Sequence, residues 1–250
     1  ARATYYGMMS EVDAQIGRLV DALKASGEYE RTLIVFTSDH GEYLGDHWQF
    51  AKYSYFDQTF YIPLIIRVPG AADDAVRGTI VDEFTENVDV MPTILDVLAL
   101  DVPNQCDGES LLPFCHGHTP AGWRDSAFSE CDFRDLIPDG SETLLGLMPD
   151  QCAFSVLRGH RYKYVHLTGL PPLFFDLKAD PDEFTNLAED PDHHAMVLEF
   201  AQRMLSLRMN HDERVLANIV LTREGPVERK TKRRHPGVEI RPLSVKAKSP

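Results

Sequence analysis

The feature that most constrains this chain is a short apolar run that ends abruptly in a polar turn. Residues 32–37 read Thr-Leu-Ile-Val-Phe-Thr, and Ser-Asp-His-Gly-Glu follows at once. A nearly unbroken apolar run of this length suits a strand buried on both faces of a parallel sheet. Ligands of open α/β sheets bind at the carboxyl ends of the strands. A carboxylate and an imidazole at that position, Asp39 and His40, are therefore well placed to hold a cation.

A second apolar run, at residues 62–68, ends in Pro-Gly and predicts another buried parallel strand. The segment between the two runs is irregular and rich in aromatic residues, and it also carries Asp46, His47 and Lys52. Its aromatic residues fit two interpretations equally well. They either pack the loop by their own rings or form the wall of an active site.

These motifs, taken in order, resemble one enzyme family. Residues 38–42, Leu-Gly-Asp-His at 44–47, Lys52 and the run at 62–70 are similar to the sulfatases and phosphonate monoester hydrolases of the alkaline phosphatase superfamily. Asp-His-Gly alone is a weak signal, because several branches of that superfamily carry it. The ordered set, with Lys52 thirteen positions beyond Asp39, is specific. The resemblance continues at residues 5–23, 107–113, 173–177, 180–183 and 186–187.

The resemblance implies a metal-dependent hydrolase of sulfate esters, phosphonate monoesters or phosphodiesters. Asp39 and His40 would bind one divalent cation, Ca²⁺ or Mn²⁺, and Lys52 would be the catalytic residue that holds a charged oxygen of the sulfuryl or phosphoryl group. Asp46 and His47 are weaker candidates for a supporting role beside the metal ligands. Singly, a helix cap, a buried imidazole and a surface cation would explain Asp39, His40 and Lys52. Their order at the end of one strand favours the functional interpretation.

The family's nucleophile is a formylglycine made from a cysteine in the pattern Cys-x-Pro/Ser-x-Arg. None of the four cysteines, at positions 106, 115, 131 and 152, is followed by that pattern. The formylglycine is therefore expected from a cysteine outside this chain. The first residues carry no start methionine and run straight into a helical pattern, which favours a chain that begins within a longer protein.

The spacing of the cysteines also indicates whether they could bind a metal and in which redox compartment the protein works. Cys115-His116-Gly117-His118 holds three potential ligands, but prolines on both sides predict an irregular loop. No pair has the Cys-x-x-Cys spacing of a zinc ribbon or redox motif. Reduced structural thiols are the favoured interpretation, which points to a cytoplasmic protein.

Hydrophobic periodicity predicts the remaining elements. Residues 4–25 have the spacing of an amphipathic helix. A second helix is expected after residue 87, with Asp89 as its cap and Pro92 in its first turn. Its predicted buried face consists of Met91, Ile94, Leu95, Leu98 and Leu100. Short strands are expected at residues 127–129, 153–157, 162–167 and 173–177, and residues 158–161 are expected to join the second and third as a hairpin turn. A covering helix is expected at 191–210.

We therefore predict an α/β fold in three parts. Residues 1–110 form the C-terminal part of an alkaline-phosphatase-like sandwich, residues 111–222 a small α+β subdomain with an antiparallel sheet, and residues 223–250 a basic tail. The tail holds nine Lys and Arg against three Glu and shows no apolar period, so it is expected to be flexible or to serve as an oligomerisation arm.

The charge and hydropathy of the chain exclude some classes of binding partner. The net charge of −14 argues against nucleic acid, because duplex binding depends on a basic surface. No segment approaches the roughly 18 consecutive apolar residues that a membrane helix needs. The expected partners are a small anionic ester as substrate and further copies of the chain in a homo-oligomer.

Two alternatives stay open. The phosphomutase and phosphodiesterase branches of the same superfamily are one, although the mutases lack the Leu-Gly-Asp-His and lysine continuation. The other is a chain without activity that serves only as a folding or assembly module. Sulfate esters and phosphonate monoesters are both singly charged tetrahedral groups, so the same metal and lysine suit both. Residues 204–211 resemble the bacterial phosphonate monoester hydrolases more closely.

Overall fold

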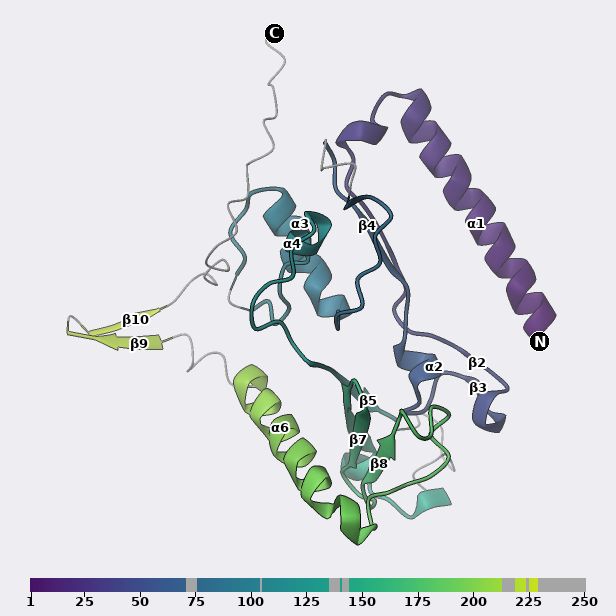
Figure 1. The fold of residues 1–250 in the computed structure, drawn as a ribbon, viewed down its shortest axis with the longest axis vertical. Helices are drawn as coiled ribbons and strands as arrows, with labels where there is room; N and C mark the ends of the chain where they lie inside the picture. Colours follow the sequence, from purple (N-terminus) through teal and green to yellow (C-terminus); the bar gives the residue numbers. More distant parts are fainter. Residues whose placement is uncertain are drawn as a thin grey trace.

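The computed structural model describes residues 1–70, 76–103, 105–134, 140, 144–212, 219–223 and 225–228. The chain begins with a long helix, α1 (Arg2–Ala25), and a two-stranded pair formed by β1 (Ile34–Thr37) and β4 (Leu64–Arg67) follows it in the sequence (Figure 1). A 3₁₀ turn at Tyr29–Arg31 joins α1 to β1. The helix at residues 4–25 and both strand positions are thus confirmed.

The prediction of parallel strands is wrong for this pair. β1 and β4 run antiparallel, with Ile34 opposite Arg67 and Thr37 opposite Leu64. A parallel pair needs a crossover connection, usually a helix, that returns the chain to the starting end of the sheet. Here residues 38–63 leave and re-enter at the same end. Both strands are also half-exposed rather than buried, and Ile65 retains 63% of its accessible surface.

The segment between β1 and β4 forms four short elements. β2 (Tyr43–Leu44) and β3 (Phe50–Ala51) pair as a hairpin, with a 3₁₀ turn at Asp46–Trp48 in its loop. A single helical turn, α2 (Asp57–Phe60), then leads back towards β4. The segment that begins with the polar turn after β1 therefore also contacts the second half of the chain, through Tyr43 and Phe56.

The next helix is α3 (Val90–Val97), preceded by a 3₁₀ turn at Asn87–Asp89. Pro92 lies in its first turn as predicted, but the predicted buried face is wrong: Met91, Leu98 and Leu100 are each at least half-exposed. The side chains that α3 buries are Pro92, Thr93, Asp96 and Val97. The reason is that the chain from residue 107 to α4 (Leu112–Cys115) covers this more polar face, where Val97 packs against Leu112 and Val68.

Asp89 does not cap α3 through its side chain. It is fully buried, and its carboxylate accepts two hydrogen bonds from Arg124, at 2.6 and 2.7 Å, and one each from the backbone N–H groups of Glu86 and Glu109, at 2.8 Å. All of its acceptor positions are therefore used, which satisfies the requirement for a buried carboxylate. The carboxylate ties the start of α3 to the segment that enters the second half of the chain.

The second half is built on a four-stranded antiparallel sheet, as predicted. Its strands follow chain order, β5 (Ser126–Asp132), β6 (Ala153–Gly159), β7 (Tyr162–Leu167) and β8 (Leu173–Asp176). β6 and β7 are joined by the two-residue loop His160–Arg161, so the predicted hairpin is confirmed. A 3₁₀ turn at Pro149–Gln151 precedes β6.

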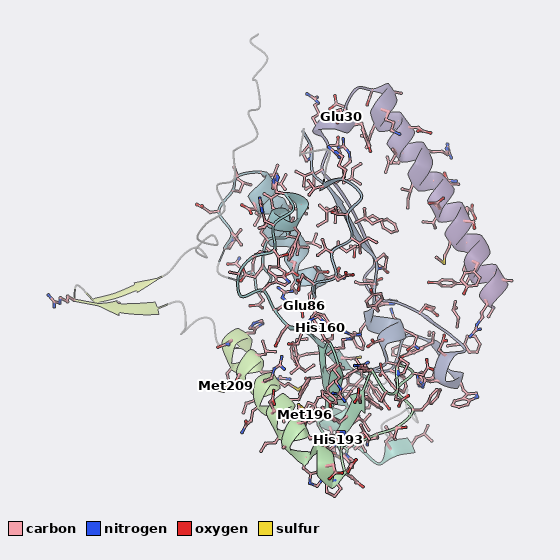
Figure 2. The ribbon with its side chains drawn as sticks, viewed as in Figure 1. Glu30, Glu86, His160, His193, Met196 and Met209 are labelled. Carbon is pink, nitrogen blue, oxygen red and sulfur yellow. The ribbon has the colours of Figure 1, made fainter. Side chains whose placement is uncertain are left out.

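Both faces of this sheet are covered. Helix α6 (His194–Asp212), preceded by a 3₁₀ turn at Pro191–His193, lies on one face and confirms the predicted helix (Figure 1). Figure 2 labels His193, which immediately precedes α6, and Met196 and Met209 towards the two ends of the helix. Its Phe200 and Met204 pack on a cluster completed by Leu157, Tyr164 and Phe174.

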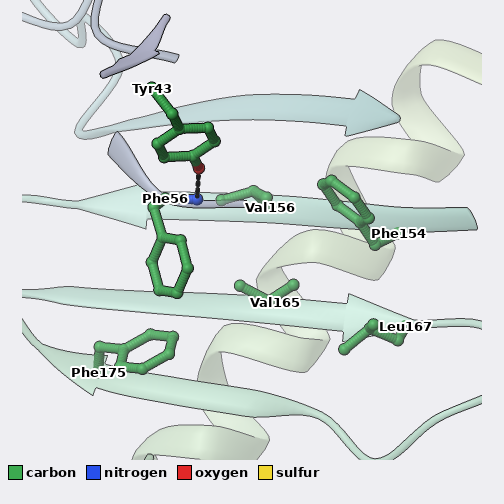
Figure 3. Close-up of a cluster of buried hydrophobic side chains, with 7 residues drawn as sticks. All are labelled: Tyr43, Phe56, Phe154, Val156, Val165, Leu167 and Phe175. Atoms are coloured by element: carbon green, nitrogen blue, oxygen red, sulfur yellow. Dashed lines mark hydrogen bonds between the residues drawn. The ribbon is translucent and has the colours of Figure 1, made fainter. Parts of the chain in front are cut away.

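On the other face of the sheet, the segment between β1 and β4 contributes to the core. Tyr43 of β2 and Phe56, which precedes α2, lie against five sheet residues (Figure 3). Those residues are Phe154, Val156, Val165, Leu167 and Phe175. The Tyr43 hydroxyl accepts a hydrogen bond from the Phe56 backbone N–H at 3.1 Å (Figure 3). The polar turn after β1 is therefore connected to a well-packed core.

Beyond α6, β9 (Ile219–Thr222) and β10 (Gly225–Glu228) pair as a separate hairpin that projects from the rest (Figure 1). The sequence did not predict this hairpin, whose second strand falls within the expected tail. Most of that tail, residues 229–250, lies outside the described residues. Within the described part of the chain, no helix combines the length and the apolar character needed to cross a membrane.

Candidate active site

The structure brings together three residues of the predicted site. Lys52 Nζ lies 2.5 Å from His40 Nε2, and the nearer Asp39 carboxylate oxygen lies 3.3 Å from the same nitrogen. The Asp39 side chain is 83% exposed and that of His40 33% exposed. A carboxylate, an imidazole nitrogen and an ammonium group thus converge at the end of β1, and the cluster is open to solvent.

The orientation of His40 is fixed by its own backbone surroundings. Its Nδ1 lies 2.7 Å from the carbonyl oxygen of Gly41, which can only accept. Nδ1 is therefore the protonated ring nitrogen, and the lone pair of Nε2 faces Lys52. A backbone carbonyl on one imidazole nitrogen is a common way to fix the tautomer of a histidine that binds a cation through the other.

Asp39 is held in its charged form. Desolvation would raise the pKa of its carboxyl, but the backbone N–H of His40, the imidazole and the ammonium of Lys52 together bring it below its ordinary value. The His40 backbone N–H donates to Asp39 at 3.0 Å. The carboxylate is therefore a ready oxygen ligand for a hard cation.

Gly41 allows this turn to pack closely against α2. Its N–H donates to the Thr59 carbonyl at 2.8 Å, and a Cβ at this position would come within 2.0 Å of the Gln58 carbonyl oxygen. No side chain larger than hydrogen fits there without moving the backbone of α2. The glycine of the Asp-His-Gly motif is thus required by a close backbone approach.

The β2–β3 hairpin, which ends one residue before Lys52, is conformationally strained. His47, Trp48 and Ala51 all have positive φ angles, of 48°, 57° and 69°. Non-glycine residues in this region are uncommon, and such strain tends to accumulate at functional sites. The strained hairpin directly precedes Lys52 and delivers its ammonium to His40.

Asn87, a residue that the sequence did not single out, is hydrogen-bonded to the end of β1. Its amide N–H₂ donates to the Ser38 carbonyl at 2.8 Å, and its amide oxygen accepts from the Thr37 hydroxyl at 3.1 Å. Asn87 stands fifty residues away in the sequence and resembles any polar residue before a helix. No spacing pattern could have identified it.

The two weaker candidates have contacts of another kind. Asp46 accepts from the Leu44 backbone N–H at 3.2 Å and lies 3.8 Å from Arg2. The His47 ring stacks on Phe56, with centroids 3.5 Å apart and planes nearly parallel. These contacts stabilise the β2–β3 hairpin, and a role for either residue beside the metal ligands stays a prediction.

Within the described residues, no group of three or more His, Cys, Asp or Glu side chains has a geometry suited to a metal ion. Asp39 and His40 are two ligands, whereas hard divalent cations take about six. Cys115, in the segment with two neighbouring histidines, lies among apolar side chains, and burial raises the pKa of its thiol to about 11. A thiol so resistant to ionisation is a poor metal ligand.

Comparisons with known proteins give these features a context. Residues 1–100 match the sulfatase family model. The multifunctional alkaline phosphatase superfamily protein PehA of Trinickia caryophylli is 47% identical over 217 residues, which cover 87% of this chain and 42% of that protein. The chain belongs to the sulfatase family. Arylsulfatase K of Bos taurus is 32% identical over 190 residues, covering 75% of this chain and 33% of that enzyme.

The solved structures agree with this assignment to the sulfatase family. The phosphonate monoester hydrolase of Agrobacterium radiobacter superposes with a TM-score of 0.83 at 46% identity, over 91% of this chain and 45% of that one. The alkaline-phosphatase-like fold and the family resemblance are thereby confirmed. The chain spans less than half the length of each of these relatives.

Proposed function

We propose that the full-length gene product is a metal-dependent hydrolase of sulfate esters or of phosphonate monoesters and phosphodiesters. The observation that carries this proposal is the convergence of Asp39, His40 and Lys52 at the end of β1. Membership of the sulfatase family supports it, because the relatives are named as arylsulfatases and a phosphonate monoester hydrolase.

The donor set of this cluster suits the divalent cation that the family implies. Asp39 offers a carboxylate that is ionised at neutral pH, and His40 offers an Nε2 lone pair because Gly41 fixes the other nitrogen as the donor. Ca²⁺ and Mn²⁺ both accept such ligands, and the remaining ones would come from residues outside those described. When bound, the cation would supply Lewis-acid stabilisation of a charged substrate oxygen.

Lys52 is the proposed substrate-binding cation. Its ammonium lies 2.5 Å from His40 Nε2 and faces the lone pair of that nitrogen. The position next to Nε2 therefore already accommodates a cation. Lys52 is exposed and has a long flexible stem, which allows the ammonium to turn towards a sulfuryl or phosphoryl oxygen. A fixed cation beside the oxygens that gain charge in the transition state is the main catalytic device for such transfers.

The thiols of this chain have the character of structural residues. Cys152 is fully buried, and burial raises the pKa of both Cys115 and Cys131. None of the four cysteines stands in the pattern that is converted to formylglycine. We therefore place the formylglycine nucleophile in residues outside this chain, and we assign binding and orientation of the substrate to Lys52.

The test is hydrolysis of an aryl sulfate and an aryl phosphonate monoester by the full-length gene product supplied with Mn²⁺ or Ca²⁺. Lys52→Ala should lower kcat/KM about a hundredfold to a thousandfold, equivalent to about 2.7–4 kcal/mol, with little change in melting temperature. Lys178→Ala, which removes an exposed lysine beyond β8, is the matched control. Equal turnover in the two variants would show that Lys52 is only a surface charge.

A further inference from the structure

Helix α2 is bound to the antiparallel sheet by an ion cluster. Asp57, its first residue, accepts from Lys163 Nζ of β7 at 2.8 Å and from two nitrogens of Arg158 of β6, each at 3.3 Å. These partners lie more than one hundred residues from Asp57 in the sequence. The cluster is thus a long-range connection between the segment after β1 and the sheet.

The sheet side of this connection is rigid. The Lys163 side chain is only 1% exposed, and its ammonium also contacts both carboxylate oxygens of Glu183 at 2.8 Å. Moving Lys163 away would leave Glu183, which is 2% exposed, as a buried charge without its counter-ion. Uncompensated buried charges are strongly destabilising, so the position of Lys163 is well determined.

The other end of α2 reaches the candidate site. Thr59 accepts the hydrogen bond from the Gly41 N–H, and the Gln58 carbonyl lies where a Cβ of residue 41 would be. The Gly41 carbonyl in turn accepts from His40 Nδ1. A continuous path of polar contacts therefore runs from Lys163 through Asp57 and the backbone of α2 to the His40 imidazole.

A helix of one turn needs such an anchor. Four residues cannot form a stable helix by their own hydrogen bonds, so α2 depends on what it packs against. Phe56 attaches it to the sheet by apolar contact, which is not directional. The ion pair between Asp57 and Lys163 adds a directional contact that sets where the Thr59 carbonyl lies.

We propose that Asp57 is a positioning residue, through which the sheet β5–β8 holds Gly41 and the imidazole of His40 in the orientation needed to bind a metal ion. The inference rests on the proposed function, since it concerns His40 as a ligand. We assign Asp57 no contact with the substrate or the metal, because its carboxylate is engaged by Lys163 and Arg158. It acts on the site only by fixing α2.

Asp57→Asn in the full-length gene product is the informative variant. The asparagine removes the charge at nearly constant shape, and Lys163 keeps Glu183 as its partner, so the core is expected to stay folded. The affinity for Mn²⁺ should fall about tenfold, the lower end of what supporting residues of metal ligands contribute. The backbone amide of Gly41 should also exchange with solvent at least several times faster in the metal-free protein. Asp57→Glu, which restores the charge, should recover most of both losses.

Met204→Ala is the matched control for general destabilisation. Met204 is 4% exposed and packs against the opposite face of the same sheet, under α6, so its loss weakens the sheet without touching α2. The proposal requires that Met204→Ala leaves Mn²⁺ affinity and Gly41 exchange within twofold of the wild type. Unchanged values in Asp57→Asn, or equal losses in both variants, would overturn it.

Failure of the proposed function has a different signature. A wild-type protein that hydrolyses neither ester, or that does not bind Mn²⁺, would refute the assigned activity or metal. The exchange rate of the Gly41 amide would still differ between Asp57→Asn and Met204→Ala if Asp57 positions the turn. Hydrolysis and Mn²⁺ binding by the wild type thus test the proposed function, and Gly41 exchange in the variants tests the role of Asp57.

Discussion

The two halves of the described chain are held together in different ways. The sheet β5–β8 has an apolar cluster on each face, and Leu157, Val165 and Phe174 at its centre are completely buried. In the first half, α1 buries none of its side chains, and the largest cluster around β4 and α3 has only Val68, Val97 and Leu112 as buried members. The deepest groups beside them include the polar side chains of Asp89 and Thr93.

The comparison shows where the candidate site obtains its rigidity. Asp39, His40 and Lys52 belong to the loosely packed half, yet the segment between them contributes Tyr43 and Phe56 to the core of the well-packed half. The site is thus carried by one half and fixed by the other. Functional residues on loops that a rigid scaffold positions are a common arrangement.

The largest expected effect is on the packing of the sheet. Phe174→Ala in the 250-residue chain should lower the free energy of unfolding by roughly 3–5 kcal/mol, because Phe174 is fully buried between β8 and α6. Leu98→Ala, at a 59% exposed position after α3, should change it by less than about 0.5 kcal/mol.

Urea unfolding followed by circular dichroism measures both values. Equal effects of the two substitutions would contradict the comparison between the halves. A substantial loss for Leu98→Ala in the full-length gene product alone would sharpen it. That result would mean that the exposed face of α3 is covered by residues outside those described.

The next largest effect is on the ion pair between Arg124 and Asp89, one of the contacts that join the halves. Arg124→Met removes the counter-ion of Asp89, whose side chain is fully buried, and should destabilise the protein by about 3 kcal/mol or more. Arg31→Gln, which breaks an exposed ion pair with Glu28, is the control and should change the melting temperature little. A small loss for Arg124→Met would show that the Arg124–Asp89 ion pair contributes little to holding the halves together.

The sequence predicted well those elements that pack against the next element along the chain. Short strands, a hairpin turn at residues 158–161 and one amphipathic helix were sufficient to predict the sheet and α6, because each strand pairs with the next. It failed at α3, where five apolar residues suggested one buried face and the structure buries another. Periodicity finds an apolar stripe but cannot tell which neighbours are present to cover it.

The candidate site shows the same division. Asp39, His40 and Lys52 were identified because they form an ordered motif within fourteen residues. Asp57 and Lys163 were missed, because the residues that fix the motif are distant in the chain. Lys163 is the second residue of β7, where a lysine suggests a solvent-exposed position, yet it is buried with its charge paired.

The smallest expected effect is on the pH dependence of stability, and it arises in the ion cluster that connects α2 with the sheet. Burial raises the pKa of Glu183 to about 7, although Lys163 partly offsets this shift. For Asp57, burial is more than offset by Lys163 and Arg158, and the pKa is lowered from its ordinary value of 3.8. Between pH 5 and 8, Glu183 is therefore the member of this cluster that changes its charge.

The sign of the effect follows from proton binding. Between the ordinary glutamate pKa of 4.5 and about 7, the folded protein retains a proton on Glu183 that the unfolded chain has lost. Stability from this group is thus fully present below pH 4.5 and is lost as pH rises through 7. Relative to Glu183→Gln, which is neutral throughout, the wild type should lose about 2.5 kcal/mol between pH 5 and 8, from about 1.4 kcal/mol per pKa unit.

Unfolding midpoints of the wild type, Glu183→Gln and Glu199→Gln at pH 5, 6, 7 and 8 provide the measurement. Glu199 is exposed on α6 and serves as the control for removal of a carboxylate. Burial also raises the pKa of Glu86, at the junction of the halves, but Glu86 is present in all three proteins and cancels in the differences (Figure 2). If the wild type and Glu183→Gln show the same pH dependence, Glu183 is ionised throughout this range. Lys163 would then pair with two charged carboxylates, and α2 would be attached to the sheet equally firmly at every pH.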